Sequence, residues 1–210
     1  MAPSAMPLAT AFDPATDGFK FSNNDVKWEW PHPGGPHGSN LCGGMVYAAL
    51  DYFKAGKTIP PDTTPPAIRT PLNSYITSRQ LAAHVRTVPR LTGGTVLFLA
   101  SPDWYVDSLA SEFDAIRKKI AGGEPVPLFV VRTAAFTGHH VLVIGCQSSP
   151  SLGNPILDIY DPNRPNDVSA ISVDYAAKRF NNKGPSTTGD GMVLKGYFVD
   201  NNYSPHQPPP

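Results

Sequence analysis

The stretch VPLFVVRTAAFTGHHVLVIGC, residues 126–146, contains two apolar runs of strand length. Both runs are rich in β-branched and aromatic side chains, a composition that favours strands. The runs in this stretch and those that follow it lie at residues 126–132, 139–146, 155–160, 170–173 and 192–199. Consecutive strands of this kind pair most readily with each other, so the sequence predicts an antiparallel sheet in the C-terminal part of the chain.

The sequence upstream of these strands has helical spacing instead. Apolar side chains recur at i, i+3, i+4 and i+7 from Cys42 to about residue 56, and similar patterns cover residues 75–88 and 106–120. Helices followed by a run of strands indicate an α+β protein with a segregated sheet, and argue against a βαβ array.

The length of 210 residues fits a single domain. We expect a flexible N-terminal segment at residues 1–18, one domain at residues 19–200 and a disordered, proline-rich tail at residues 201–210. Within the domain, the pattern predicts a helical lobe at about residues 40–122 and a sheet lobe at about 126–199.

Charge and composition exclude several classes of partner. Lys and Arg total 17 and Asp and Glu also total 17, so the net charge is zero and gives no electrostatic basis for binding nucleic acid or an anionic membrane. No apolar run has the length needed to span a bilayer, and Met1–Thr16 lacks the features of a signal peptide. We therefore expect a monomer that is either cytoplasmic or exported by a non-classical route.

The two cysteines are too few and too far apart for a zinc ribbon, and no metal or cofactor is predicted. Cys42 stands at the predicted start of a helix, where free backbone N–H groups and the helix dipole lower the pKa of a thiol. Because the thiolate is the nucleophile, this position favours a catalytic cysteine. Gly43 and Gly44 follow it, and we expect them to let a substrate approach the first turn closely.

A cysteine nucleophile needs a base, and that base needs an orienting acceptor. His139 and His140 open a strand, and alternation along the strand sends them to opposite faces, so only one of them is expected to reach Cys42. Asp161 follows the next strand and is the favoured acceptor, with Asn163 as the alternative.

These three motifs together resemble papain-fold cysteine peptidases. Such proteins have a cysteine at a helix N-terminus, then H-x-V-x-x-x-G on a strand, then Asp or Asn after the next strand. The chain matches the histidine motif at His139, Val141 and Gly145, and this register favours His139 over His140. The chain more closely resembles uncharacterised bacterial papain-like proteins. It is also similar to bacteriocin-processing peptidase domains, in which the third residue is an Asp followed by Pro.

The resemblance implies a papain-like fold, with the active site in a cleft between a helical lobe and a sheet lobe. It also implies that Cys42 attacks a carbonyl, that His139 transfers the proton and that Asp161 fixes the imidazole tautomer. The backbone N–H of Cys42 would supply half of an oxyanion hole. These enzymes usually place a Gln about six residues before the cysteine, where this chain has Pro36. Ser39 and Asn40 are the candidates to replace it, and His37 is conceivable.

The sequence thus predicts a cysteine hydrolase, most simply a peptidase acting on a peptide or protein substrate. One alternative is a transglutaminase-like enzyme or an amidase, acting as an effector or toxin with the same triad. A second alternative is a papain-like binding module whose catalytic site is degenerate.

Overall fold

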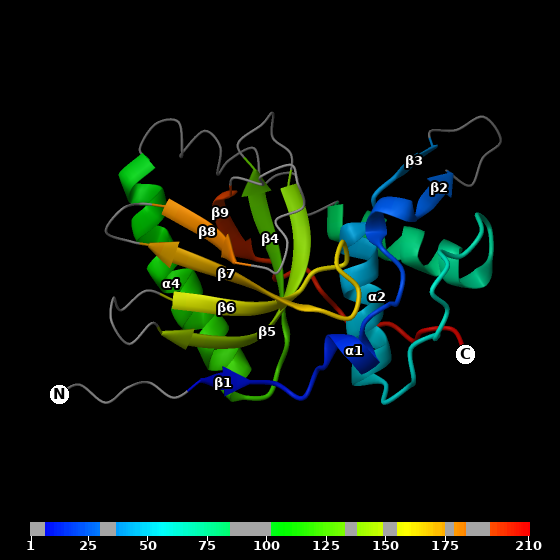
Figure 1. Ribbon diagram of the computed structural model, residues 1–210, viewed down its shortest axis with the longest axis horizontal. Coiled ribbons are helices and arrows are strands. Elements are labelled where there is room, and N and C mark those ends of the chain that lie inside the picture. Colours follow the sequence, from blue (N-terminus) through cyan, green and yellow to red (C-terminus); the bar gives the residue numbers. More distant parts are fainter. Residues whose placement is uncertain are drawn as a thin grey trace.

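Seven strands form an antiparallel sheet at the centre of the protein (Figure 1). In this computed structural model the strands are β1 (Leu8–Ala9), β4 (Val126–Arg132), β5 (Gly138–Ser148), β6 (Pro155–Tyr160), β7 (Val168–Asp174), β8 (Arg179–Lys183) and β9 (Leu194–Val199). Their order is β8-β7-β6-β5-β4-β9, and β1 pairs with β5. The structure describes residues 7–29, 37–84, 102–132, 138–148, 155–174, 179–183 and 194–210, and the statements below concern these residues.

The predicted α+β class and the antiparallel sheet are confirmed. Every strand expected from the apolar runs is present, with ends that differ by a few residues. Two strands of this sheet were not expected, and neither was a separate ribbon of β2 (Lys27–Glu29) and β3 (His37–Ser39). β8 has the sequence RFNNK, which lacks an apolar run, and β1 is only two residues long.

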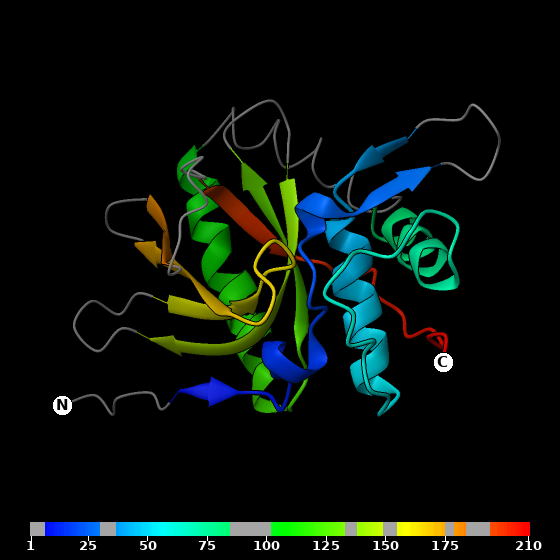
Figure 2. The same ribbon diagram turned by 45° about the vertical axis from the view of Figure 1, so that its right-hand side comes forward.

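The helices lie on both faces of the sheet (Figure 2). These are α1 (Pro14–Asp17), α2 (Cys42–Lys54), a helix whose described part covers residues 71–84, and α4 (Pro102–Ala121). A short 3-10 turn, η1 (Asn23–Asp25), and a two-stranded ribbon of β2 (Lys27–Glu29) and β3 (His37–Ser39) precede α2. None of the helices described here is both long and apolar enough to cross a membrane.

Alternation along β5 divides the core into two clusters. Val141 and Val143 belong to the cluster that α4 covers, whereas Leu142 and Ile144 belong to the cluster around α2. This is the period-two pattern of a strand that is buried on both faces. The central strand therefore connects the two halves of the hydrophobic core.

The expected division into a helical lobe and a sheet lobe is wrong for α4. Ile116 and Ile120 of this helix pack with the sheet residues Val126 and Leu128, in the cluster that excludes α2. The apolar stripe of α4 is real, but it covers the sheet instead of the other helices. Spacing reveals that a helix has an apolar face, and it does not reveal which element covers that face.

The expected flexibility of residues 1–18 is wrong for the part that the structure describes, residues 7–18. Leu8 and Ala9 pair with Cys146 and Gly145 of β5. The Phe12 side chain is buried, and its ring centroid lies 5.3 Å from that of Phe53. This segment therefore belongs to the domain.

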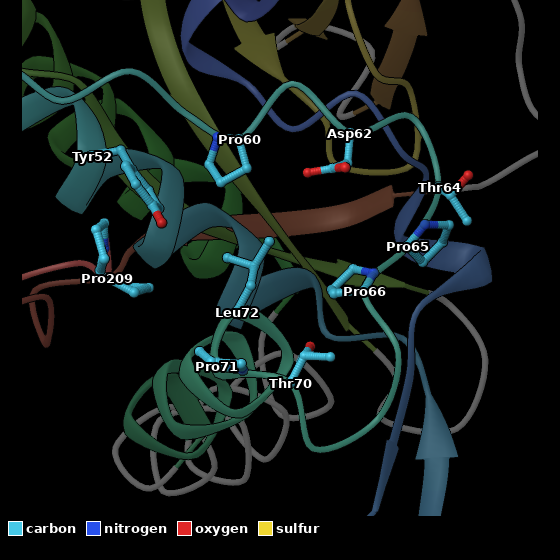
Figure 3. Close-up of a pocket in the computed structure, with 11 residues that line it drawn as sticks. Tyr52, Pro60, Asp62, Thr64, Pro65, Pro66, Thr70, Pro71, Leu72 and Pro209 are labelled. Atoms are coloured by element: carbon cyan, nitrogen blue, oxygen red, sulfur yellow. The ribbon is translucent and has the colours of Figure 1, made fainter.

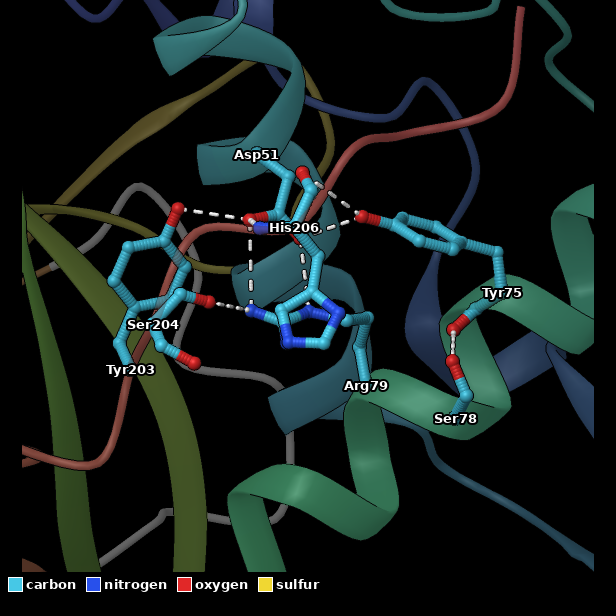
Figure 4. Close-up of polar contacts among 7 residues, drawn as sticks. All are labelled: Asp51, Tyr75, Ser78, Arg79, Tyr203, Ser204 and His206. Atoms are coloured by element: carbon cyan, nitrogen blue, oxygen red, sulfur yellow. Dashed lines mark hydrogen bonds and ion pairs between the residues drawn. The ribbon is translucent and has the colours of Figure 1, made fainter.

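The expected disorder of residues 201–210 is also wrong. The Tyr203 hydroxyl donates to Oδ1 of Asp51 at 2.8 Å, and the backbone N–H of His206 donates to the same oxygen at 2.9 Å (Figure 4). Lys57 Nζ donates to the carbonyl of Pro208 at 2.9 Å. The prolines are typical of disordered tails, but these hydrogen bonds hold the segment against α2.

Asp51 is the centre of this anchorage. Its Oδ2 lies 2.8 Å from Nε of Arg79, and both side chains are almost fully buried. The Tyr75 hydroxyl donates to the same oxygen at 2.7 Å, and the Arg79 guanidinium lies 4.9 Å from the centroid of the Tyr47 ring. The buried carboxylate thus has its counter-charge and its hydrogen-bond donors from two segments of the chain, the 71–84 helix and the C-terminal segment.

Removing the Arg79 charge should therefore be costly. We expect Arg79→Met to lower the free energy of unfolding by about 3–5 kcal/mol, because Asp51 would keep a buried charge without its partner. Glu29→Gln is the matched control, since it breaks the exposed ion pair of Glu29 with Arg69, whose atoms lie 3.1 Å apart. That pair should contribute no more than about 1 kcal/mol. Urea denaturation measures both, and equal losses would contradict this account.

Candidate active site

Cys42, the first residue of α2, lies against an end of β5 that β6 does not cover. The register between β5 and β6 begins at Leu142, opposite Tyr160, so residues 138–141 have no partner in β6. The backbone N–H of His140 donates instead to the Cys42 Sγ, with 3.5 Å between the atoms. The end of β6 thus leaves room for the helix N-terminus beside the central strand.

His139 and Asp161 meet at the same place. Nε2 of His139 lies 2.7 Å from Oδ1 of Asp161, and both side chains are buried. The backbone N–H of Asn163 also donates to this Oδ1, at 2.9 Å. Because Asp161 takes Nε2, Nδ1 is the imidazole nitrogen left to face the thiol, with which His139 shares a side-chain hydrogen bond. The structure therefore brings Cys42, His139 and Asp161 together.

The expectation that only one histidine can reach Cys42 is wrong. The two rings lie on opposite sides of β5, but the Cys42 sulfur accepts the backbone N–H of His140 at the end of the strand, and both imidazoles lower the pKa of its thiol. His140 has its own carboxylate, since its Nε2 lies 3.3 Å from Oδ2 of Asp200. The alternation argument assumed that the thiol would face a single side of the sheet.

The electrostatics of this cluster favour a thiolate–imidazolium pair. Burial alone would raise the pKa of Cys42, but the charges and hydrogen bonds of His139 and His140 outweigh it and hold that pKa well below its usual value. Burial opposes the charged form of His139, yet Asp161 and Cys42 together raise the pKa of His139. Burial also opposes the charged form of Asp161, whose pKa is nevertheless lowered, chiefly by His139. Each shift favours the ionised form of its group.

Three asparagines connect the two sides of the site. Nδ2 of Asn23 donates to Oδ1 of Asn163 at 2.9 Å and lies 3.4 Å from Oδ1 of Asn40. Asn163 therefore supports Asp161, and it does not replace that residue as the partner of His139. Asn40 has a left-handed backbone, with φ of 74°, and its side chain is exposed. Sequence reasoning missed Asn23, which has no motif to mark it.

The remaining oxyanion candidates are only partly described. Ser39 and His37 form part of β3, while their side chains and all of Pro36 lie outside the described residues. Within the described part of the chain, no acceptor takes the backbone N–H of Cys42. This N–H points from the start of α2, as an oxyanion donor requires.

Gly43 and Gly44 have a different role from the one expected. A Cβ on Gly44 would lie 2.2 Å from the carbonyl oxygen of Ile76, and one on Gly43 would lie 2.8 Å from Cβ of Ala83. The space beside these glycines is therefore filled by the 71–84 helix and is not open to substrate. Gln80 of that helix accepts the N–H of Gly44 at 2.6 Å and so caps α2, which sequence reasoning also missed.

One cavity of about 550 Å³ lies elsewhere (Figure 3). Its lining includes Tyr52, Leu72 and several prolines, among them Pro60, Pro71 and Pro209. Tyr52 stands ten residues after Cys42, which is about 15 Å along the helix. This cavity is therefore distinct from the Cys42 cluster.

Both cysteines are free thiols. Cys146 lies on β5 in the cluster under α4, and burial raises its pKa. Among the described residues, no group of three or more His, Cys, Asp or Glu side chains could hold a metal ion. Comparison with known proteins finds no matching family model, no matching curated protein and no matching solved structure.

The contact between α2 and the 71–84 helix can be tested at Gly44. We expect Gly44→Ala to lower the free energy of unfolding by about 1–3 kcal/mol, because its Cβ would overlap a backbone oxygen and force the helices apart. Helix propensity alone would give the opposite sign. Gly122→Ala is the control, since its Cβ would meet its nearest atom at 3.3 Å. Urea unfolding of both variants checks this, and a stabilised Gly44→Ala would contradict it.

Proposed function

We propose that this protein is a cysteine hydrolase that cleaves an amide bond, most simply a peptidase with a papain-like arrangement. The observation that carries the proposal is the contact of 2.7 Å between His139 and Asp161, beside Cys42 at a helix N-terminus. Nucleophile, base and orienting carboxylate follow in the chain order of the papain-like proteins that the sequence resembles. Their positions on a helix, a strand and the end of the next strand also agree with that resemblance.

Each group has a defined part in the reaction. The Cys42 thiolate attacks the carbonyl carbon, forming an S–C bond, and the His139 imidazolium gives its proton to the leaving nitrogen as the C–N bond breaks. His139 then takes a proton from water, whose oxygen attacks the thioester and releases the thiolate. Asp161 keeps the proton-bearing Nε2 of His139 in place through both steps.

The oxyanion that forms at each step needs donors. The backbone N–H of Cys42 supplies one, and the helix dipole at the start of α2 adds a partial positive charge there. Asn40 and Ser39 remain the candidates for a second donor. Of these, Asn40 has a described side chain, which is exposed and linked to Asn23.

The proposal predicts that Cys42 reacts as a thiolate at low pH. The alkylation rate by iodoacetamide, followed for each cysteine by peptide mass spectrometry, should rise for Cys42 at a pH well below the free-thiol pKa of about 8.5. Cys146 is an internal control, because its raised pKa should delay its reaction to higher pH. The pH at which each rate rises is compared, so differences in exposure do not affect the result. Parallel profiles for the two thiols would contradict the proposal.

Hydrolysis itself is tested on a proteome-derived peptide library. We expect new peptide termini with the wild-type protein and none with Cys42→Ala. On any peptide cleaved, His139→Ala should lower kcat/KM by at least about 100-fold, through loss of the proton transfer. Activity should rise as Cys42 loses its proton and fall as His139 loses its own, so a bell-shaped pH profile should lie between the lowered and the raised pKa.

The same experiment separates the alternatives. Incorporation of an added primary amine into the library, in place of cleavage, would indicate a transglutaminase-like reaction. If neither cleavage nor amine incorporation occurs and Cys42 has an ordinary thiol profile, the result would favour a binding module.

A further inference from the structure

The His140 side chain is buried in an enclosed site that has no part in the proposed triad. The ring is fully buried on the α2 side of β5, and its centroid lies 4.8 Å from that of Phe129 and 6.4 Å from that of Tyr47. His84 of the 71–84 helix lies 6.3 Å away, centroid to centroid. On the remaining side, an ideal Cβ on Gly43 would stand 3.0 Å from Nδ1 of His140. The ring is thus enclosed, and a residue larger than glycine would crowd it.

Asp200 supplies the counter-charge for this ring. It follows β9 and is almost fully buried, with its Oδ2 lying 3.3 Å from Nε2 of His140. The Tyr47 hydroxyl donates to the same oxygen at 2.6 Å, and the backbone N–H of Asn202 donates to Oδ1 at 3.0 Å. Two hydrogen-bond donors on one buried carboxyl group favour its ionised form, and a buried carboxylate requires a cation beside it, which the His140 ring can supply.

Several titratable groups surround His140 and determine the charge near its ring. They are Cys42 and Tyr47 on α2, His84 on the neighbouring helix, His139 on β5 and Asp200 after β9. Tyr47 stays protonated, because burial and Asp200 raise its pKa. The negative groups that act on the His140 ring are therefore the Asp200 carboxylate, 3.3 Å from Nε2, and the Cys42 thiolate, whose sulfur accepts the backbone N–H of the same residue.

We propose that His140 and Asp200 form a second dyad, which holds Cys42 as a thiolate independently of His139. The proposal rests on the hydrolase function, in which Cys42 is the nucleophile. His140 and Asp200 are positioning residues, because the buried ring acts on the sulfur and not on the substrate. The backbone N–H of His140 contributes as well, through its bond of 3.5 Å to Sγ.

This arrangement has a consequence for the reaction. His139 loses its proton to the leaving nitrogen, so the acyl-enzyme has a neutral His139. His140 keeps its proton throughout, since Asp200 and not the substrate is its partner. A positive charge therefore remains beside the sulfur when the thiolate is released from the thioester. In a triad with a single histidine, no fixed cation would remain there.

The test compares two charge-neutral double variants, each of which removes one imidazolium and one carboxylate. One is His139→Gln with Asp161→Asn, the other is His140→Gln with Asp200→Asn. Both are made with Cys146→Ser, so that Cys42 is the sole thiol. The measurement is the iodoacetamide rate against pH, with circular dichroism as the check on folding. Asp158→Asn is the matched control, because this half-buried carboxylate on β6 lies opposite Gly145 of β5, five residues along the strand from His140.

We expect each double variant alone to retain part of the lowered thiol pKa, and the combination of both to bring it to the ordinary value of about 8.5. Once the pKa lies above 6, the rate at pH 6 should fall about tenfold for each further unit by which the pKa rises. Asp158→Asn should leave the profile unchanged. If the His140→Gln, Asp200→Asn variant fails to fold, Tyr47→Phe takes its place, because it removes one donor to Asp200 and keeps the aromatic ring. It should raise the pKa of Cys42 by a smaller amount.

The outcomes separate the two proposals. A low thiol pKa that disappears with His139 and Asp161 alone would overturn the second dyad and leave the hydrolase function standing. The same holds if the His140 and Asp200 variant, or Tyr47→Phe in its place, matches the parent profile. An ordinary thiol pKa in the parent protein would overturn both.

Discussion

The hydrogen bond from the backbone of His140 to the sulfur of Cys42 is the contact on which the rest of the site depends. It exists because β6 ends opposite Leu142 and exposes the end of β5 to the first turn of a helix. Strand ends then supply the carboxylates from both sides, Asp161 after β6 and Asp200 after β9. A helix N-terminus seated on a strand end thus gathers charged groups from distant parts of the chain into one buried cluster.

The cost of burying these charges explains much of the surrounding structure. A buried carboxylate is tolerated only with a cation and with donors for its oxygens. Asp161 has His139 and a backbone N–H, Asp200 has His140 and a tyrosine, and Asp51 has Arg79 and two tyrosines. The same rule therefore applies both to the cluster at the start of α2, around Cys42, and to the cluster around Asp51 in the same helix.

Much of this could be predicted from local patterns. Apolar runs gave the strands and helical spacing gave α2, while the residues at the ends of these elements pointed to Cys42, His139 and Asp161. The partner of α4 could not be predicted, because an apolar stripe does not name what covers it. Asp200 and Tyr47 are 153 positions apart and no motif links them. In residues 201–210, the prolines led to a prediction of disorder, and the sequence does not show that the Tyr203 hydroxyl binds Asp51 and holds the segment in place. The contact of His140 with Cys42 was missed because alternation predicts the side of the sheet on which a side chain lies, and not which helix packs against the end of the strand.

The segment from Asp200 to His206 contacts α2 at both Tyr47 and Asp51. In chain order this segment comes after every strand of the sheet, whereas α2 precedes all of the strands except β1, β2 and β3. Since a chain is synthesised from its N-terminus and earlier parts can begin to fold first, the helix that starts at Cys42 exists long before its surroundings are complete. The Cys42 thiol would therefore acquire its final environment only after every strand of the sheet has been synthesised and the segment from Asp200 to His206 has packed against α2.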